Sequence, residues 1–175
     1  MHITHLSLAN FRNYRRLELD LPSSVVVIQG DNAQGKTNLL ESIHLMSTTK
    51  SHRASTDREL LHHDAMSEDM PVARVCADAQ RARGQVRLEF ALRVDRTPMV
   101  DAAAAPDSGN STLPLRKQVR VNGIARRSAD FVGQVNVVMF NAQDIDLVTG
   151  RAALCRRYLD LVCSQLDSIY LRALQ

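Results

Sequence analysis

Apolar and polar residues alternate over three stretches of the chain, a pattern that predicts strands with one buried face. The longest stretch covers residues 85–95, where nearly every second residue is apolar. Two shorter stretches, 3–8 and 17–21, lie on either side of residues 11–14 and are expected to form a hairpin. The alternation therefore predicts a sheet with one face against the core.

More strands are expected beside the stretch at 85–95. Residues 72–78 are candidates to pair with it. Further along, residues 118–121 and Ile124 enclose Asn122-Gly123, a dipeptide that accepts the positive φ angles of a type I′ turn. A second, tight hairpin is therefore expected there.

Two largely apolar runs are also expected to be strands. They cover residues 25–28 and 135–140, and the first is expected to be buried. A helical pattern follows the first run, with Leu39, Ile43 and Met46 on one face.

Loops and helices account for the rest of the chain. Polar, aperiodic residues at 47–57 and a proline- and alanine-rich stretch at 97–114 predict loops. A helix is expected from about Arg151, and residues 168–175 continue in a helical pattern. We expect three segments: strands, a loop and the first helix over 1–60, a β-rich segment over 70–140, and the start of a helical lobe over 141–175.

The loop between the first apolar run and the first helix matches a known motif. Residues 30–37 read Gly-Asp-Asn-Ala-Gln-Gly-Lys-Thr, the complete G-x-x-x-x-G-K-[ST] pattern of a phosphate-binding loop. Gly30 and Gly35 let the backbone curl so that successive N–H groups point at one spot, where the helix dipole adds positive potential. The expected nucleotide-binding residues are Gly30, Asp31, Asn32, Ala33, Gln34, Gly35, Lys36 and Thr37.

The last two residues of this loop have separate expected roles. Lys36 is expected to reach the β and γ phosphates of a nucleotide, and the Thr37 hydroxyl is expected to ligate the Mg²⁺ that bridges them. A Gly-rich connector before a core helix would explain the glycines, but it would need neither Lys36 nor Thr37. The motif therefore favours nucleotide binding.

Composition narrows the class of protein. At 175 residues with 45% hydrophobic residues, the chain can form the core of one globular domain or of one lobe. No stretch has membrane-spanning length and no signal-peptide profile is present, so a soluble, cytoplasmic protein is expected. Cys76, Cys155 and Cys163 are widely spaced, and the histidines lack metal-ligand spacing, which argues against disulfides and zinc.

The positive charge is carried mostly by arginine. The net charge is +3, the pI is about 9.0, and the lysines are limited to Lys36, Lys50 and Lys117. Local arginine clusters of the kind that contact phosphate backbones occur at 12–16, 81–87, 126–127 and 156–157. Ordinary solvated faces explain these clusters equally well, so charge alone leaves DNA binding open.

Other nucleotide-binding enzymes fit less well. Residues 130–133 match the GTPase pattern D-x-x-G, but Ala142 stands where the guanine-reading N-K-x-D motif has lysine. No second apolar strand ends in the acidic residue that a P-loop hydrolase uses to hold magnesium. A free-standing P-loop kinase is an alternative, and so is a non-enzymatic folding lobe or protein-contact surface.

Taken together, the motifs resemble the RecF family of bacterial recombination and gap-repair ATPases, which is related to SMC heads. The resemblance covers nearly the whole chain. It is carried, in the family's order, by residues 6–14, 30–43, 51–53, 121–123, 144–150, 156–160, 164–167 and 170–171.

The resemblance implies a fold class and a limit on activity. The fold would be an α/β P-loop NTPase of ABC/SMC-head type, a mixed sheet with an antiparallel β subdomain, incomplete at the C-terminus. The family's Walker B strand end, signature motif and helical arm are expected beyond Gln175. No catalytic residue is therefore assigned, and weak ATP binding with poor hydrolysis is expected of this chain, with slow ATPase activity only in a full-length dimer.

The resemblance also implies cofactors and partners. The cofactors would be ATP and Mg²⁺, and ATP would drive formation of a homodimer. The DNA ligand would be single-stranded or gapped duplex DNA. RecR and RecO would cooperate in loading RecA during replication, repair and the SOS response.

Three residues outside the loop are implied as possible contacts to DNA or nucleotide: Arg12, Arg53 and Gln143. Arg53 falls where related heads place an arginine after the first helix. Gln143 would belong to a glutamine loop, but the family has proline and an acidic residue where Ala142 and Gln143 stand. A plain surface glutamine is an equally good interpretation.

Overall fold

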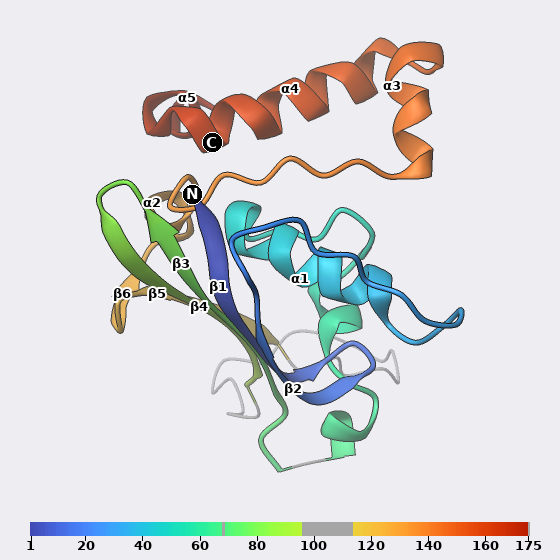
Figure 1. The fold of residues 1–175 in the computed structure, drawn as a ribbon, viewed down its shortest axis with the longest axis vertical. Helices are drawn as coiled ribbons and strands as arrows, with labels where there is room; N and C mark the ends of the chain where they lie inside the picture. Colours follow the sequence, from blue (N-terminus) through green and yellow to red (C-terminus); the bar gives the residue numbers. More distant parts are fainter. Residues whose placement is uncertain (68, 96–113, 175) are drawn as a thin grey trace, which may run out of the picture.

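A single antiparallel sheet of six strands forms the centre of the molecule (Figure 1). The computed structural model describes residues 1–67, 69–95 and 114–174. The strand order is β2-β1-β3-β4-β5-β6. The strands are β1 (His2–Phe11), β2 (Tyr14–Asp20), β3 (Val72–Arg81), β4 (Gly84–Val94), β5 (Leu115–Val121) and β6 (Ile124–Arg126).

Five α-helices and three short 3-10 helices accompany the described part of the sheet. The α-helices are α1 (Lys36–Thr48), α2 (Ser128–Phe131), α3 (Asp146–Thr149), α4 (Ala152–Leu166) and α5 (Ser168–Ala173). The 3-10 helices are η1 (Asp57–Leu60), η2 (Asp64–Ser67) and η3 (Ala142–Ile145). The loop expected at 97–114 lies almost entirely outside the described residues.

The alternating stretches form the strands that their pattern predicted. β1 and β2 make the first hairpin, in which Leu8 pairs with Leu17. In the β3–β4 pair, Val75 lies opposite Phe90, and both side chains are buried in the core. Because side chains alternate across a strand, the residues between these core positions point to the opposite, solvent-facing side of the sheet.

The second hairpin has the expected turn. Asn122 and Gly123 have φ angles of 51° and 78°, both in the left-handed region. The Asn122 side-chain oxygen also accepts a hydrogen bond of 2.9 Å from the backbone N–H of Arg87, while the Asn122 N–H donates to the Arg87 carbonyl at 2.8 Å. The turn therefore connects β5 to β6 and is also hydrogen-bonded to β4.

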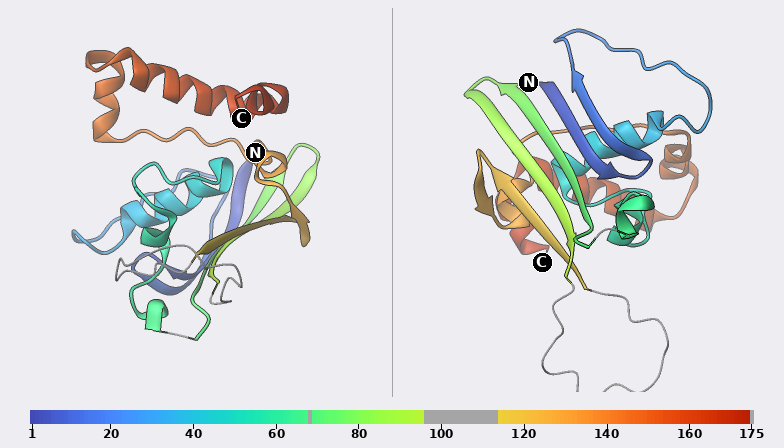
Figure 2. Two further views of the ribbon diagram at one scale, coloured as in Figure 1. Left: turned by 180° about the vertical axis from the view of Figure 1, so that it is seen from behind. Right: turned by 90° about the horizontal axis from the view of Figure 1, so that it is seen from below.

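Helix α1 covers the core face of the sheet (Figure 2). Leu39, Leu45 and Met46 are buried against the strands. The helical pattern predicted two of them, Leu39 and Met46. Ile43 is half-buried and packs against the same core. Helix α1 is covered on a second side as well, which buries polar residues such as Glu41.

The two strands expected at 25–28 and 135–140 are absent. Both segments lie outside every ladder among the described residues. Val25 is 91% exposed and Phe140 is 76% exposed, whereas strands buried on both faces would hide such side chains. A strand requires a neighbouring backbone edge, and no described segment offers one to either run.

A side chain takes the place of a neighbouring strand at one point of the second run. The Gln165 amide on α4 accepts a hydrogen bond of 2.8 Å from the Val137 N–H and donates one of 3.2 Å to the Val137 carbonyl. Gln165 is only 6% exposed. This pair of bonds holds the extended segment against α4, the helix that was expected from about Arg151.

None of the helices in the described part of the chain is long and apolar enough to cross a membrane. The three cysteines are free thiols. No group of three or more potential metal-ligating side chains meets within residues 1–67, 69–95 and 114–174.

Candidate nucleotide-binding site

The loop at 30–37 is curled by left-handed backbone conformations. Gly35, which caps α1, has a φ angle of 101°, and Ala33 has one of 66°. A residue with a Cβ is strained at such angles, so glycine is the residue that suits position 35. The curl directs the chain from the exposed segment 25–30 into the first turn of α1.

Lys36 lies across this curled loop. Its Nζ donates hydrogen bonds of 2.6 Å to the Gly30 carbonyl and 2.5 Å to the Asp31 carbonyl. The ammonium group therefore reaches back over the loop from the first residue of α1, and the concave side of the loop carries a positive charge.

The first turn of α1 has the character of an anion site. Gly35 provides no side-chain cap, and no acidic residue is present in the first turn. Thr37 is exposed, and its hydroxyl has no hydrogen-bond partner among the described residues. Unpaired N–H groups, the helix dipole and Lys36 together favour a multiply charged anion at this end.

The tip of the β1–β2 hairpin packs against the loop at 30–37. A Cβ at position 35 would lie 2.6 Å from the Asn13 side-chain nitrogen and 2.9 Å from the Tyr14 hydroxyl. Asn13 also accepts a hydrogen bond of 2.8 Å from the Asn38 side chain. The hairpin and the beginning of α1 are thus in close contact, which a side chain at position 35 would obstruct.

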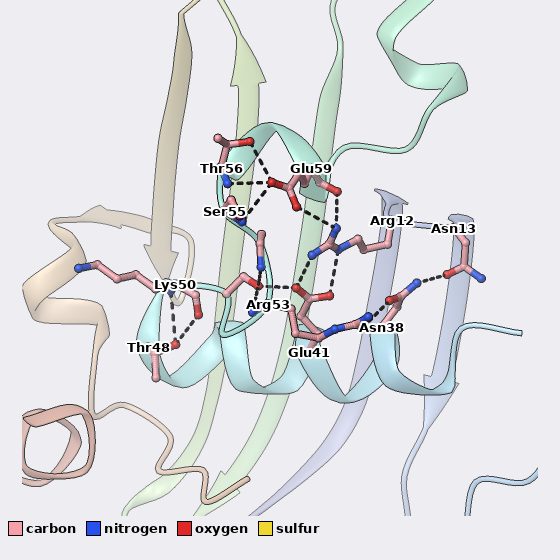
Figure 3. Close-up of polar contacts among 12 residues, drawn as sticks. Arg12, Asn13, Asn38, Glu41, Thr48, Lys50, Arg53, Ser55, Thr56 and Glu59 are labelled. Carbon is pink, nitrogen blue, oxygen red and sulfur yellow. Dashed lines mark hydrogen bonds and ion pairs between the residues drawn. The ribbon is translucent and has the colours of Figure 1, made fainter. Parts of the chain in front are cut away.

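Arg12, at the same hairpin tip, forms a bidentate ion pair with Glu41 on α1 (Figure 3). The Nε–Oε2 and Nη2–Oε1 distances are 2.9 and 2.7 Å, and the Glu41 side chain is fully buried. Arg12 also donates to the Glu59 carbonyl at 2.9 Å. Its guanidinium therefore connects the sheet, α1 and η1.

Glu41 has a second partner in the loop that follows α1. The Ser51 hydroxyl donates to Glu41 Oε1 and accepts hydrogen bonds from the Arg53 and Ala54 N–H groups at 3.0 and 2.8 Å. Burial acts to raise the pKa of Glu41, but the hydrogen bonds from Arg12 and Ser51 outweigh burial and hold that pKa below its usual value. Glu41 is therefore ionised at neutral pH.

The loop after α1 places Arg53 beside the N-terminal end of that helix. The Arg53 Nη1 lies 3.4 Å from the Asn38 side-chain oxygen, two residues after Lys36, and the side chain is exposed. Arg53 is thus near the loop, as expected of a nucleotide contact. Arg12, in contrast, directs its guanidinium into the ion pair with Glu41.

An open groove continues from this point along η1 and η2. Its volume is about 610 Å³, and its lining includes Asn38, Arg53, Arg58, Leu61, His62 and Met66. The Arg58 Nη1 atom is buried without a hydrogen-bond partner in the described structure. The groove thus offers basic groups and apolar contacts directly beside the first turn of α1. The sequence pattern around residues 58–66 does not predict this groove.

Two further residues from the sequence analysis are less informative. The backbone of Gln143 lies in η3, and its side chain lies outside the described residues. Asp144, from the rejected GTPase motif, accepts a hydrogen bond of 2.6 Å from the Asn141 N–H. That carboxylate is engaged in a local turn, which agrees with the rejection.

Comparison with known families shows which proteins this chain resembles. Residues 5–138 match the family described as AAA domain. The chain belongs to the AAA domain family. Its curated relatives include the DNA replication and repair proteins RecF of Roseiflexus castenholzii, Chloroflexus aurantiacus and Halalkalibacterium halodurans, which are 44%, 43% and 38% identical over 99% of the chain. The resemblance to RecF is thereby confirmed.

The chain spans 43%, 43% and 40% of the length of these relatives, respectively. Solved structures agree on the fold. The structure described as the recombination mediator protein RecF-ATP in the RecFOR pathway matches 98% of this AAA domain chain and 40% of its own, with a TM-score of 0.77 and 28% identity. A second RecF structure, with ATPrS, has a TM-score of 0.74. The expected P-loop NTPase fold of ABC/SMC-head type is therefore confirmed.

Breaking the ion pair between Arg12 and Glu41 should destabilise the protein. Glu41→Gln and Arg12→Gln should each lower the free energy of unfolding by about 3 kcal/mol, because each leaves a charged group without its partner in a buried place. The double variant should lose at least about 1 kcal/mol less than the sum. Urea unfolding measures this. Exposed Glu18→Gln is the control, and additive losses would contradict the coupling.

His44 is a buried base on the same helix, α1. It is 5% exposed, and its ring contacts that of His52 at a centroid distance of 5.2 Å. Burial, with a smaller effect of His52, lowers the pKa of His44 to about 4. Burial also lowers the pKa of His52. Both rings therefore stay neutral in the folded protein at pH values where the unfolded chain binds protons.

Stability should consequently fall as the pH falls from 6.5 towards 4. The unfolded chain takes up the His44 proton first, so this residue alone should remove about 2 kcal/mol of stability between pH 7 and pH 5. Thermal unfolding of His44→Asn at both pH values should show a smaller pH dependence than wild type. The fully exposed His63→Asn should behave as wild type. Equal pH dependence in His44→Asn would contradict the assignment.

Proposed function

We propose that this chain is the ATP-binding part of a RecF-type DNA replication and repair protein that binds single-stranded or gapped DNA. The observation that carries the proposal is the curled loop at 30–37, with the Lys36 ammonium drawn over it at the uncapped end of α1. Support comes from the RecF relatives and from the solved RecF-ATP structure with a TM-score of 0.77.

The residues of the loop fit a nucleoside triphosphate. Its backbone amides and the first turn of α1 provide donors for phosphate oxygens, and Lys36 provides the cation. Each charge-assisted hydrogen bond contributes about 1.5–3 kcal/mol. The exposed Thr37 hydroxyl, free of other described partners, would hold Mg²⁺ at this end. Bound there, Mg²⁺ would neutralise charge on the phosphates.

The groove beside Arg53 and Arg58 fits the remaining part of the nucleotide. It begins at Asn38, close to the phosphate end, and its volume of about 610 Å³ is in the usual range for a small-molecule site. Leu61 and Met66 offer apolar contact for a base. The exposed Arg53 guanidinium offers donors for a sugar or phosphate oxygen.

The partners and location belong to the same proposal. RecF relatives and the RecFOR pathway suggest RecR and RecO as partners, with RecA as the loaded recombinase. An ATP-dependent homodimer and a cytoplasmic location complete the scheme. The kinase alternative is not favoured, because the relatives are replication and repair proteins rather than kinases.

Removing the ammonium group of Lys36 should abolish nucleotide retention and preserve the fold. Lys36→Ala should bind a fluorescent ATP analogue at least about tenfold more weakly, since two or more charge-assisted contacts are lost. Its unfolding temperature without nucleotide should match that of wild type, because Lys36 contacts only loop carbonyls.

Lys50→Ala is the matched control, because Lys50 is exposed and lies beyond the other end of α1. It should bind the analogue as wild type does. Normal binding by Lys36→Ala, or equal losses in both variants, would contradict the proposed site.

A further inference from the structure

The solvent-facing side of the sheet contains a hollow of about 340 Å³ that the nucleotide site does not use. Its floor is formed by two small residues, Ala9 on β1 and Ala91 on β4, which lie on either side of Arg74 in one row of the sheet. Around it stand the side chains of Arg74, Arg93 and Arg120, from three successive strands.

These three arginines are exposed and lack compensating partners. None of them makes an ion pair or a side-chain hydrogen bond to another residue in the described parts of the chain. Glu89 also lines the hollow, opposite Arg120 in the strand register, but it forms no ion pair with it. Three unpaired guanidinium groups around one hollow repel one another, and an anionic ligand would relieve that repulsion.

Several other charged side chains on this face are already paired. His5 lies 2.7 Å from Asp20 and 3.0 Å from Glu18 at the opposite end of the face, and Arg87 lies 3.8 Å from Asp78. The face therefore has an acidic end with internal partners and a basic end, in which Arg116 is paired with Asp95 but Arg74, Arg93 and Arg120 are not paired within the described residues. An anion would be attracted to the basic end alone.

The chemistry of the hollow favours phosphate over carboxylate peptides. Guanidinium forks bind phosphate oxygens in pairs, and rigid neighbouring strands hold the three forks across a width of about 10 Å. The apolar lining is limited to the methyl groups of Ala9 and Ala91 and to the partly buried Val72, which gives a peptide side chain little apolar surface on which to anchor.

The hollow also favours a duplex over unstacked bases. Sites for single strands combine basic grooves with aromatic side chains on which bases stack. The solvent-facing side of β3, β4 and β5 in the described structure includes no aromatic ring; its residues are Val72, Arg74, Cys76, Asp78, Gln80, Gln85, Arg87, Glu89, Ala91, Arg93, Arg116, Gln118 and Arg120. Phosphate contacts to a duplex need no such ring.

We propose that this hollow binds the phosphate backbone of duplex DNA, with Arg74, Arg93 and Arg120 as the contacting residues. The inference rests on the proposed DNA-binding function and assigns a surface to it. Because α1 and the loop at 30–37 lie on the core side of the sheet, the hollow stays accessible when nucleotide is bound.

The test compares two variants with the same change in net charge. Arg74→Gln/Arg93→Gln/Arg120→Gln removes the three guanidinium groups of the hollow. Arg83→Gln/Arg156→Gln/Arg172→Gln removes three exposed arginines that lie outside this face. Fluorescence anisotropy measures binding of wild type and both variants to a short DNA duplex over a range of salt concentrations, with a fluorescent ATP analogue as the check on the nucleotide site.

The hollow variant should bind the duplex at least about tenfold more weakly at moderate salt, and the slope of log K against log salt should shrink by about 2–3. The control variant should change affinity by less than about twofold, since it leaves the proposed contacts intact. Both should bind the ATP analogue normally.

Equal losses in both variants, or no loss in the hollow variant, would overturn the assignment of this surface while leaving the proposed function standing. If the hollow variant loses affinity only for oligo(dT), the assignment is overturned in favour of a single strand. If polyglutamate of equal charge displaces the duplex, it is overturned in favour of an acidic protein. If wild type itself fails to bind duplex, gapped or single-stranded DNA, the proposed function fails as well.

Discussion

The bidentate pair between Arg12 and the fully buried Glu41 is the interaction on which the arrangement of the nucleotide site depends. Arg12 comes from the tip of the first hairpin, and Glu41 lies on the second turn of α1. Glu41 also accepts from Ser51, whose hydroxyl fixes the backbone of Arg53. One carboxylate thus joins the sheet, the helix and the loop that carries the neighbouring arginine.

This pair also sets the electrostatic character of the site. A buried carboxylate near the beginning of α1 would oppose an anion, but Arg12 neutralises it locally. Lys36, Arg53 and Arg58 then leave the loop and groove positively charged overall, although Asp31 lies in the loop and Glu59 lines the groove. The pair is therefore a reason why a helix with a buried glutamate can still present a positive end to phosphate.

The sequence predicted those elements whose determinants are local. Alternation identified the strands around 85–95, the Asn122-Gly123 pair identified its turn, and the phosphate-loop motif located the start of α1. Residues 25–28 and 135–140 were expected to be strands because apolar runs indicate burial. Strand formation also requires a neighbouring strand with unpaired backbone groups, and an apolar run alone does not specify that strand.

The side-chain partnerships also required the structure. Arg12 stood in a basic cluster with nothing to indicate that its partner, 29 residues away, would be Glu41. The arginines of the outer hollow are dispersed along the chain and meet only through the strand register. The division into segments 1–60, 70–140 and 141–175 stays a prediction, and so do the roles of Arg12, Arg53 and Gln143 as contacts to DNA or nucleotide.

The central claim is that backbone amides of the loop at 30–37, assisted by one ammonium group, hold a triphosphate. A crystal structure of the protein with Mg²⁺ and a non-hydrolysable ATP analogue tests it most directly. The account predicts phosphate oxygens within hydrogen-bonding distance of the loop amides and of Lys36 Nζ, with the metal at the Thr37 hydroxyl. A loop that stays closed by Lys36, with the analogue bound at another surface, would contradict it.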